Sequence, residues 1–411
     1  MKSFKAIIFS VILTTTLFFY NSLFAQSEST YQIVESVPIE TDLGLDETER
    51  TFEVWMEIIK KAQHSIEIEC FYVSNKAGEP LEDILSEIKK SAKRGVQVRF
   101  LVDAKMKKTY PQPLDDLNKI KNIEVRATNY FNKIGGVIHT KYILVDREIL
   151  FIGSQNFDWR ALKHIHEVGF NIKNEKLAQM FGLIFDLDWK IASDDRTDSI
   201  EKYFEKNTIQ MINSKNPITL EVGTKKEIKL YPSFSPKNLI YSGMNWDEDE
   251  IIKLIDKAES EILIQLLSYS VKDKNEYYSK LDNAIRSASI RGVNVNIILS
   301  DWSKGKSKLP YLNSLAMIPN VKIHFTTIPE WSGGQIPYSR VEHCKFLLVD
   351  EQYGWLGTSN WAKDYFYKSR NMGIVFESKF VAEIIHKMFY KSWDSEYTNL
   401  ILPNEKRKST K

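Results

Sequence analysis

Two short segments of this chain carry the same set of side chains at the same spacing. One of them places six polar or glycine residues within eighteen positions: His343, Lys345, Asp350, Gly357, Thr358 and Asn360. The other carries the matching residues 204 positions earlier: His139, Lys141, Asp146, Gly153, Ser154 and Asn156. Because side chains alternate faces along a strand, each histidine and its lysine are expected to project together.

Two histidines, two lysines and two asparagines are suited to the cleavage of a phosphodiester. One imidazole attacks phosphorus, the other protonates the leaving oxygen, and the cations and amides hold the non-bridging oxygens. This arrangement requires no metal ion or cofactor, and the remaining histidines form no metal-binding motif. The hydroxyls of Ser154 and Thr358 follow a glycine that permits a tight turn, so they are expected to be further donors to the substrate.

The two segments lie inside a longer repeat, which indicates what positions them. The offset of 204 residues continues from Trp189 to Trp393, and "RGVQVRFLVD" from Arg94 resembles "RGVNVNIILSD" from Arg291. Each copy reads as an apolar strand, an amphipathic helix, a second strand, a basic loop, a strand pair with the histidine, and a closing helix. Alternating strands and helices predict an α/β fold.

The length of 411 residues fits two domains of ordinary size. We predict a first domain over residues 30–204, a polar linker over 205–227, a second domain over 228–400 and a basic tail over 401–411. The net charge is only +2, so a polyanionic substrate must be held by local basic surface.

The N-terminal residues 1–25 predict export. A lysine-bearing start, an apolar run from Ala6 and a small residue at Ala25 are typical of a cleaved signal peptide. An uncleaved membrane anchor is the alternative, since the run approaches the roughly 20 residues that span a bilayer. The protein is therefore expected to be extracytoplasmic, secreted or periplasmic. Its two cysteines, Cys70 and Cys344, are expected to be buried thiols.

The pattern His-x-Lys-x4-Asp-x6-Gly-Ser/Thr-x-Asn, present twice, resembles the phospholipase D superfamily. The resemblance covers nearly all of the mature chain. It implies a duplicated domain, with two mixed-sheet α-β-α sandwiches packed as a pseudo-two-fold pair and one active site at their interface. Surrounding segments such as "GGVIHTKYILVD", "LYPSFSP" and "GTSNWAKDYF" are similar to the endolysosomal 5′-exonuclease branch. That branch implies single-stranded DNA or RNA as substrate, with phospholipid as the alternative.

The resemblance also implies roles for individual residues. His139 would be the nucleophile that forms a phosphohistidine, and His343 the proton donor that later activates water. The non-bridging oxygens would be held by Lys141, Lys345, Asn156 and Asn360. Glu167 matches the family's carboxylate that orients a histidine, whereas the second copy has Asn371 at that position. Because a carboxylate makes an imidazole the better nucleophile, this asymmetry favours His139 for that role, on the expectation that Glu167 supports it.

The remaining candidates are less specific. Strand alternation turns Asp146 and Asp350 away from the histidines, so both are interpreted as structural. Lysines in the basic loop of each copy are candidates for contacts with a nucleic-acid backbone: Lys105, Lys107 and Lys108, and Lys304, Lys306 and Lys308. Candidates for base stacking are Trp302, Trp331, Trp361 and Tyr365. Solvated loops and core aromatic residues are the alternative for each of these.

The sequence thus predicts a metal-independent phosphodiesterase that works through a covalent phosphohistidine, and more specifically a 5′ exonuclease on single-stranded nucleic acid. The first alternative is a phospholipase D or phosphatidyl transferase, although no amphipathic membrane-binding segment stands out after the signal. The second is a non-catalytic binding protein, against which the two complete motifs argue.

Overall fold

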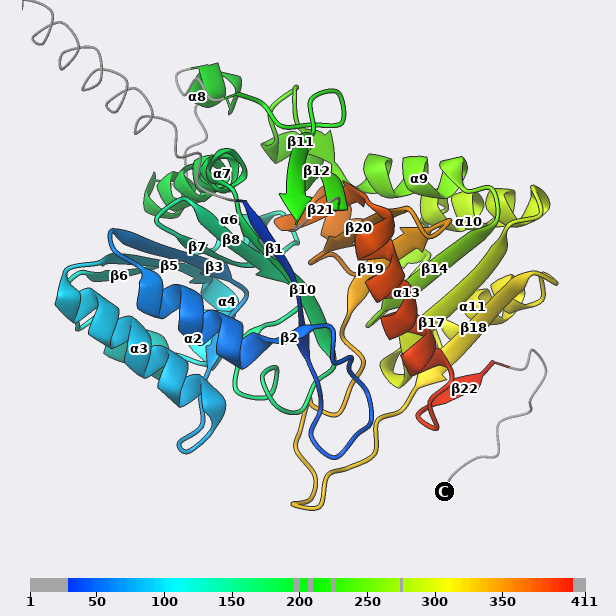
Figure 1. Cartoon of the computed structure of the whole chain (residues 1–411), viewed down its shortest axis with the longest axis horizontal. Helices are drawn as coiled ribbons and strands as arrows, with labels where there is room; N and C mark the ends of the chain where they lie inside the picture. The colour runs from blue at the N-terminus through cyan, green and yellow to red at the C-terminus, as the bar shows by residue number, and fades with distance from the viewer. Residues whose placement is uncertain (1–28, 195–199, 206–209, 223–225, 274–275, 402–411) are drawn as a thin grey trace, which may run out of the picture.

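The computed structural model describes residues 29–194, 200–205, 210–222, 226–273 and 276–401. The predicted signal peptide and residues 402–411 of the predicted tail lie outside these ranges. Within them, the chain forms two α/β halves, each with its own large mixed sheet (Figure 1). No helix in these ranges is both long enough and apolar enough to cross a membrane.

The first half is built on an eight-stranded sheet with the order β2-β1-β10-β8-β7-β3-β5-β6. The neighbours β3, β5 and β6 run parallel, and β7, β8, β10 and β1 follow in antiparallel pairs. The strands are β1 (Thr30–Ser36), β2 (Glu49–Arg50), β3 (Ser65–Cys70), β5 (Gln97–Asp103), β6 (Ile123–Thr128), β7 (Lys141–Val145), β8 (Ile149–Gly153) and β10 (Glu167–Lys173).

The second half repeats this order with additional edge strands. Its sheet runs β11-β12-β21-β20-β19-β14-β17-β18-β22, with β13 beside β12. The strands are β11 (Ile218–Val222), β12 (Lys226–Ser235), β13 (Asn245–Trp246), β14 (Glu261–Leu266), β17 (Asn294–Ser300), β18 (Val321–Thr326), β19 (Lys345–Val349), β20 (Tyr353–Gly357), β21 (Asn371–Glu377) and β22 (Thr398–Leu400). The duplicated α/β fold expected from the sequence is therefore present.

The stretch predicted as a polar linker contains part of the second sheet. β11 lies within it and pairs antiparallel with β12, and Leu220 faces Ile228 in the register. Both of these side chains are buried. The apolar residues that alternate in this otherwise polar stretch therefore add an edge strand rather than a free connection.

Helices cover both outer faces of the molecule and its centre. In the first half α2 (Thr51–Lys61) and α3 (Pro80–Arg94) share a core with the sheet, and α9 (Asp247–Lys257) and α10 (Lys280–Ile290) do so in the second. Figure 1 shows these two pairs at opposite sides of the molecule. The closing helices α7 (Glu175–Asp194) and α13 (Lys379–Trp393) belong to one central core, which joins the inner faces of both sheets. The two halves therefore pack as one body.

Shorter elements connect these helices and strands. They are β4 (Val73–Ser74), α4 (Ala104–Thr109), α5 (Gln112–Leu117), α6 (Tyr130–Lys133), β9 (Phe157–Asp158), α8 (Ile200–Glu205), η1 (Lys237–Leu239), β15 (Lys272–Asp273), β16 (Glu276–Tyr277), η2 (Asp301–Lys304), α11 (Leu309–Ala316) and α12 (Lys363–Tyr367).

Local sequence explains where the elements end. Helix α3 begins with Pro80, whose fixed φ suits the first helical turn, and ends before Gly95, which adopts a φ of 108°. Acidic residues in its first turn and basic ones in its last complement the helix dipole. The amphipathic helix predicted before the second strand is thus bounded by the signals present in its sequence.

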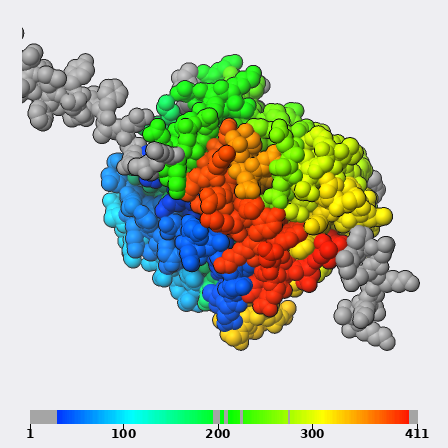
Figure 2. Space-filling model, turned by 45° about the vertical axis from the view of Figure 1, so that its right-hand side comes forward, coloured from blue at the N-terminus to red at the C-terminus, as the bar shows by residue number. Residues whose placement is uncertain are grey.

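Segments far apart in the sequence meet along the junction of the halves. Figure 2 shows the blue segment after β1 against the red C-terminal region, with the gold segment before β19 at the lower edge. Arg340 Nη1 donates to the carbonyl of Ile39 at 2.7 Å, and the backbone of Ser332 donates to Glu40 at 2.7 Å. Loops of both halves are therefore tied to each other beside the interface.

Candidate active site

Both motif histidines lie where the two halves meet. Strands β7 and β19 begin at the motif lysines, so each histidine stands two residues before its strand. The backbone N–H of His139 donates to Arg370 O at 2.9 Å, and that of His343 donates to His166 O at 2.9 Å. Each histidine is thus held by backbone from the opposite half, and the site is complete only when the halves are packed together.

The imidazole partners also come from the opposite half, and they correct one expectation. His343 Nδ1 lies 2.7 Å from Glu167 Oε2, and His139 Nδ1 lies 3.1 Å from Asn371 Oδ1. The prediction that Glu167 supports His139 was wrong. Glu167 follows the first motif along the chain, but the packing of the halves brings it beside the histidine of the second motif.

The hydrogen bonds of Asn371 fix which of its atoms faces His139. Its Nδ2 donates to the carbonyl of Tyr365 at 2.9 Å, and its Oδ1 accepts from Thr358 Oγ1 at 3.0 Å. An amide oxygen and a carboxylate are both acceptors, so Nδ1 carries the hydrogen in each histidine. The chemistry therefore falls to the two Nε2 atoms.

The hydroxyls of Ser154 and Thr358 do not line the pocket, contrary to the prediction that they contact substrate. Ser154 Oγ accepts from the backbone of Val168 at 3.0 Å, and Thr358 Oγ1 accepts from Met372 N at 3.1 Å. Both residues are fully buried. They lie one layer behind the histidines, where Thr358 orients the amide of Asn371.

Two buried lysines place positive charge beneath the histidines. Lys141 Nζ donates to the carbonyl of His139 at 2.8 Å, and Lys345 Nζ donates to that of His343 at 2.7 Å. Burial, with the charge of Lys345, lowers the pKa of Lys141 well below its usual value, and burial lowers the pKa of Lys345 to about 8. An anionic phosphate in the pocket would favour the charged form of both.

The same environment keeps both imidazoles neutral at rest. Burial, followed by the charges of the two motif lysines, lowers the pKa of His139 and of His343 well below the ordinary value. Burial raises the pKa of the Glu167 carboxyl, and Lys345 opposes that rise. A neutral imidazole whose Nδ1–H points at an acceptor has its lone pair on Nε2, which is the form that a nucleophile needs.

The histidines open into a pocket of about 390 Å³ between the halves. Asn156 and Asn360 line it beside them, as predicted for the groups that hold phosphate oxygens. Asn360 Nδ2 donates to the hydroxyl of Tyr365 at 3.1 Å. Within the described residues, the buried Oδ1 atoms of both asparagines have no hydrogen-bond partner. Both asparagines therefore lie at the pocket wall with an unsatisfied side-chain oxygen.

Aromatic rings from both halves line this pocket with the histidines. Tyr72 and Tyr110 of the first half stack with ring centroids 5.2 Å apart, and Trp302 and Tyr338 of the second half lie edge to face at 6.4 Å. Tyr365, a predicted stacking residue, packs edge-on against His139 at 4.9 Å. Tyr72, Tyr110 and Tyr338 were not predicted from the sequence, although Tyr72 comes two residues after strand β3, where ligand sites of α/β sheets commonly form.

The basic segments do not contribute their lysines to the pocket wall. The first forms helix α4 and contributes Met106, and the second forms the turn η2 and contributes Trp302. Lys107 pairs with Asp115 at 3.2 Å, and Lys304 lies over the ring of Phe325 at 5.3 Å. The other predicted lysines stand outside the lining: Lys105, Lys108, Lys306 and Lys308. A helical turn directs successive side chains to different sides, so Met106 faces inward beside outward lysines.

Two of the tryptophans proposed for stacking lie elsewhere. Trp361 is fully buried in the core of the second half. Trp331 packs against His164, with ring centroids 5.1 Å apart. Of the predicted tryptophans, Trp302 is the one placed at the pocket.

The motif aspartates occupy turns remote from the pocket. Asp146 accepts from three consecutive backbone N–H groups, those of residues 63–65, at 2.7 to 2.9 Å. Asp350 accepts equivalently from residues 259–261 at 2.8 to 2.9 Å. Both aspartates have a positive φ, 53° and 51°, as hairpin turns between short-linked strands require. They join the catalytic hairpin to the start of the neighbouring strand.

Comparisons with known proteins agree with this geometry. The family model described as cardiolipin synthase, PLD-like domain, matches residues 55–189 and 251–393. The chain is 28% identical to phospholipase D Y of Dictyostelium discoideum over 409 residues, covering 90% of this chain and 92% of that protein. It is 29% identical to the 5'-3' exonuclease PLD3 of Xenopus laevis over 400 residues, covering 90% and 80%.

Two further similarities were found, one in sequence and one in fold. The virion nicking-joining enzyme of vaccinia virus (strain Copenhagen) is 26% identical over 387 residues, covering 89% of this chain and 88% of that protein. A solved structure, the phosphatidylserine synthase of Haemophilus influenzae, aligns with a TM-score of 0.56 at 16% identity and covers 85% of each chain. At that identity the structural likeness concerns the fold alone.

Proposed function

From the premise that this chain belongs to the phospholipase D superfamily, and is therefore a phosphodiesterase, we propose that it is a nuclease. Its substrate would be single-stranded DNA or RNA, and it would remove nucleotides from the 5′ end. The relatives support a phosphodiester substrate of either kind, since their names include an exonuclease, a nicking-joining enzyme and phospholipases. The choice among these depends on the pocket.

The aromatic walls carry the proposal. Tyr72 and Tyr110 of the first half, and Trp302 and Tyr338 of the second, line the same pocket as the two histidines. Aromatic rings bind single-stranded nucleic acid by stacking, at about 1–3 kcal/mol per base and with little dependence on sequence. A volume of about 390 Å³ is within the range of pockets for small ligands and suits a nucleotide unit.

The partners of the histidines assign the catalytic roles, and they reverse the assignment made from the sequence. We propose His343 as the nucleophile, because the carboxylate of Glu167 stabilises the positive charge that its imidazole gains on attack. His139 would be the acid, because the amide of Asn371 stabilises its imidazolium less and leaves the proton easier to give up.

The reaction then has two balanced steps. His343 Nε2 forms a bond to phosphorus while the phosphorus–oxygen bond to the leaving sugar breaks, and His139 Nε2–H gives its proton to that oxygen. In the second step His139 takes a proton from water, and the resulting hydroxide displaces His343 from phosphorus. Lys141 and Lys345 stabilise the negative charge on the phosphoryl oxygens throughout, as fixed cations beneath the pocket.

The first experiment is cleavage of 5′- and 3′-labelled single-stranded oligonucleotides in EDTA, with the H139A and H343A proteins alongside. Mononucleotides released stepwise from the 5′ end by the unmodified chain, and by neither variant, are the expected result. Vesicles of phosphatidylcholine in a parallel assay distinguish the other substrate class. Choline release without oligonucleotide cleavage would contradict the nuclease proposal and leave the phosphodiesterase site intact.

We also propose that the protein is exported by the segment 1–25, which lies outside the described residues. A mature N-terminus at Gln26 in the secreted or periplasmic fraction is the expected result of N-terminal sequencing. Retention of the full chain in the membrane fraction would favour the anchor instead.

A further inference from the structure

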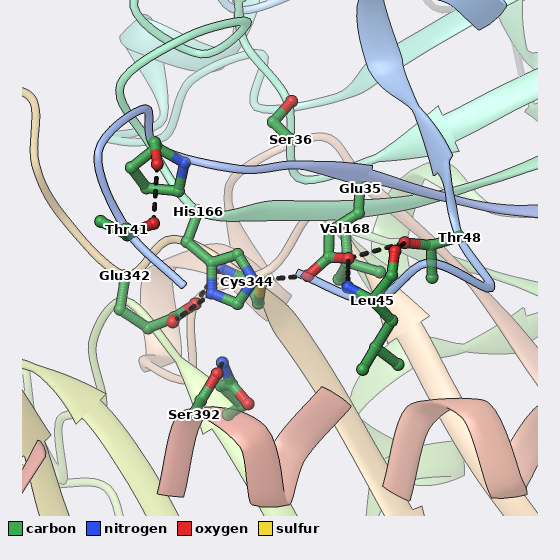
Figure 3. A network of polar contacts seen from close by, with 12 residues as sticks. Glu35, Ser36, Thr41, Leu45, Thr48, His166, Val168, Glu342, Cys344 and Ser392 are labelled. Carbon is green, nitrogen blue, oxygen red and sulfur yellow. Dashed lines mark hydrogen bonds and ion pairs between the residues drawn. The ribbon is translucent and has the colours of Figure 1, made fainter. Parts of the chain in front are cut away.

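A further histidine, His166, lies beside the catalytic His343 and is held between two carboxylates (Figure 3). His166 Nε2 is 2.8 Å from Glu35 Oε1, and its Nδ1 is 2.7 Å from Glu342 Oε2. All three side chains are fully buried. A carboxylate offers acceptors, so both ring nitrogens must donate and the ring is an imidazolium. A buried cation thus holds two buried anions from different parts of the chain.

Electrostatics agree with this state. Burial alone would lower the pKa of His166, but its contacts with Cys344 and Glu342 raise the pKa well above the ordinary value. Against the opposing effect of burial, His166 lowers the pKa of both Glu35 and Glu342. The three groups therefore stabilise one another's charges.

This cluster shares its backbone with the catalytic pair. His166 precedes Glu167, and Glu342 precedes His343. The two segments form a parallel bridge in which His166 N donates to Val341 O at 3.1 Å and His343 N donates to His166 O at 2.9 Å. The Glu167–His343 bond and the His166–Glu342 bond therefore connect the same two segments, and a change in one strains the other.

The pseudo-equivalent position in the other half differs in a way that bears on function. Arg370, 204 residues after His166, forms the matching bridge and pairs with Asp188 at 2.7 Å. The residue equivalent to Glu342 is Ile138. The second copy thus has a carboxylate, Glu342, next to its catalytic histidine, and the first copy supplies the cation, His166, that neutralises it. Uncompensated, the charge of Glu342 would favour protonation of the nearby Glu167.

We propose that His166 is a positioning residue of this phosphodiesterase, whose imidazolium neutralises Glu342 and so keeps Glu167 ionised as the acceptor for His343. The proposal rests on the catalytic role of His343 but not on the identity of the leaving group. It assigns a function to a histidine outside both motifs.

The geometry favours an ion pair over a metal centre. Ligand atoms of His166, Glu342 and Cys344 lie within 4.8 Å of one another, a spacing that also admits a metal ion. In a tetrahedral zinc site, however, ligands at the usual bond lengths are roughly 3.3 Å apart. The 2.7 Å between Nδ1 and the carboxylate is a hydrogen-bond distance.

The proposal has a consequence for pH. The titratable and charged groups around His166 are Glu35 from β1, Glu342 and Cys344 beside β19, and Arg50 from β2, whose Nη1 lies 3.6 Å from Glu35. A histidine with a raised pKa is charged below that pKa and loses its proton above it. On an ester whose leaving group needs no proton from His139, activity should therefore fall at the alkaline end as His166 becomes neutral.

The test is hydrolysis of bis(4-nitrophenyl) phosphate by the full chain, which needs neither a nucleic acid nor a lipid. H166Q should lower kcat about 10- to 100-fold at unchanged KM, the usual cost of losing a supporting partner. H166Q/E342Q should recover part of the loss, because no carboxylate remains to be neutralised. H166K should retain more activity than H166Q and move the alkaline limb to higher pH. His64, which is exposed, provides the control variant H64Q.

Three results would overturn the proposal. The first is a loss of activity in H166Q that is proportional to its loss of folded protein, with H166Q/E342Q no more active than H166Q. The second is an alkaline limb that does not move in H166K. The third is one equivalent of bound metal in the purified protein that disappears in C344S. Turnover of the nitrophenyl ester without cleavage of oligonucleotides would contradict the nuclease proposal alone, since the comparison of His166 variants remains valid on the ester.

Discussion

The two catalytic histidines occupy equivalent places in equivalent halves, but their surroundings differ. His343 is backed by Glu167, and His139 by Asn371. One layer deeper, the titratable cation His166 of the first copy lies beside His343, where the permanent cation Arg370 of the second copy lies beside His139. A symmetric frame provides two imidazoles at one pocket, and on the roles we propose these differences of partner make His343 the better nucleophile and His139 the better acid.

The fold and the reaction place different demands on the two halves. The frame benefits from repetition, since each half supplies the same strand order and the same histidine–lysine geometry. Phosphodiester cleavage by attack and protonation requires one neutral and one protonated imidazole at the same moment. Because the halves are covalently joined, each copy can carry its own partner residues, and the asymmetry becomes possible.

The largest difference between the two histidines should appear when each is removed and the leaving group of the substrate is varied. H343A should lose activity by at least about 10⁴-fold on any substrate, because the covalent intermediate cannot form. H139A should lose about 10²- to 10⁴-fold on an oligonucleotide but form the intermediate readily from bis(4-nitrophenyl) phosphate, whose leaving group needs no proton. Stopped-flow absorbance of nitrophenolate measures both.

Peptide mapping after alkaline quench identifies the phosphorylated histidine in the H139A protein. A phosphohistidine at position 343 is expected, because the acid variant also lacks the base for the hydrolytic step. A burst of nitrophenolate from H343A, with the phosphoryl group on His139, would restore the roles assigned from the sequence.

The next largest effect should come from exchanging the partners. E167Q should lower kcat about 10²- to 10⁴-fold, because an amide stabilises the developing imidazolium of His343 less than a carboxylate does. N371D should change kcat much less, since His139 acts only after it has been protonated and a carboxylate only holds that proton more tightly. Steady-state rates of the two variants give the comparison directly, with circular dichroism as the control for folding. Equal losses in both would indicate that the partners do not distinguish the histidines.

A smaller effect should appear in the pH dependence. Burial and the motif lysines lower the pKa of His139 well below its ordinary value, so the donor gains its proton only as pH falls. On an oligonucleotide, whose leaving group needs a proton, the rate should rise toward acid, pass its maximum below about pH 6.5, and fall when His343 is protonated as well. N371D should move the acid-donor limb upward, because a carboxylate raises the pKa of the histidine it faces. Initial rates across the acid range test both statements, and an optimum above neutrality would contradict them.

The smallest effect on catalysis is expected at the motif aspartates. D146A and D350A each remove a carboxylate that accepts three backbone N–H groups, so each should lose about 1–3 kcal/mol of stability. The kcat per folded molecule should stay nearly unchanged, because both turns are outside the pocket. Chemical denaturation paired with active-site titration separates these outcomes. A large loss of kcat in a fully folded D146A protein would assign the aspartate a role in the chemistry.

Much of the frame could be predicted because it is encoded locally. The strands alternate with helices whose ends are marked by residues such as Pro80 and Gly95, and the repeat shows which segments are equivalent. The family model matches both copies, as the duplicated motifs suggested. Spacing along a strand also placed each histidine with its lysine. Local periodicity does not show which side of a loop faces a neighbour, and this is why the lysines of α4 and η2 were expected at the pocket that Met106 and Trp302 line.

The sequence by itself determined the two halves, the paired His-x-Lys motifs and the reaction class. The tertiary structure decided which carboxylate serves which histidine, which aromatic rings line the pocket, and that His166 lies between Glu35 and Glu342. The physical reason is that these contacts join residues far apart in the chain, several of them from different halves. The hydrogen bond between Glu167 and His343 spans 176 positions of the chain, and only the packing of one sheet against the other selects it.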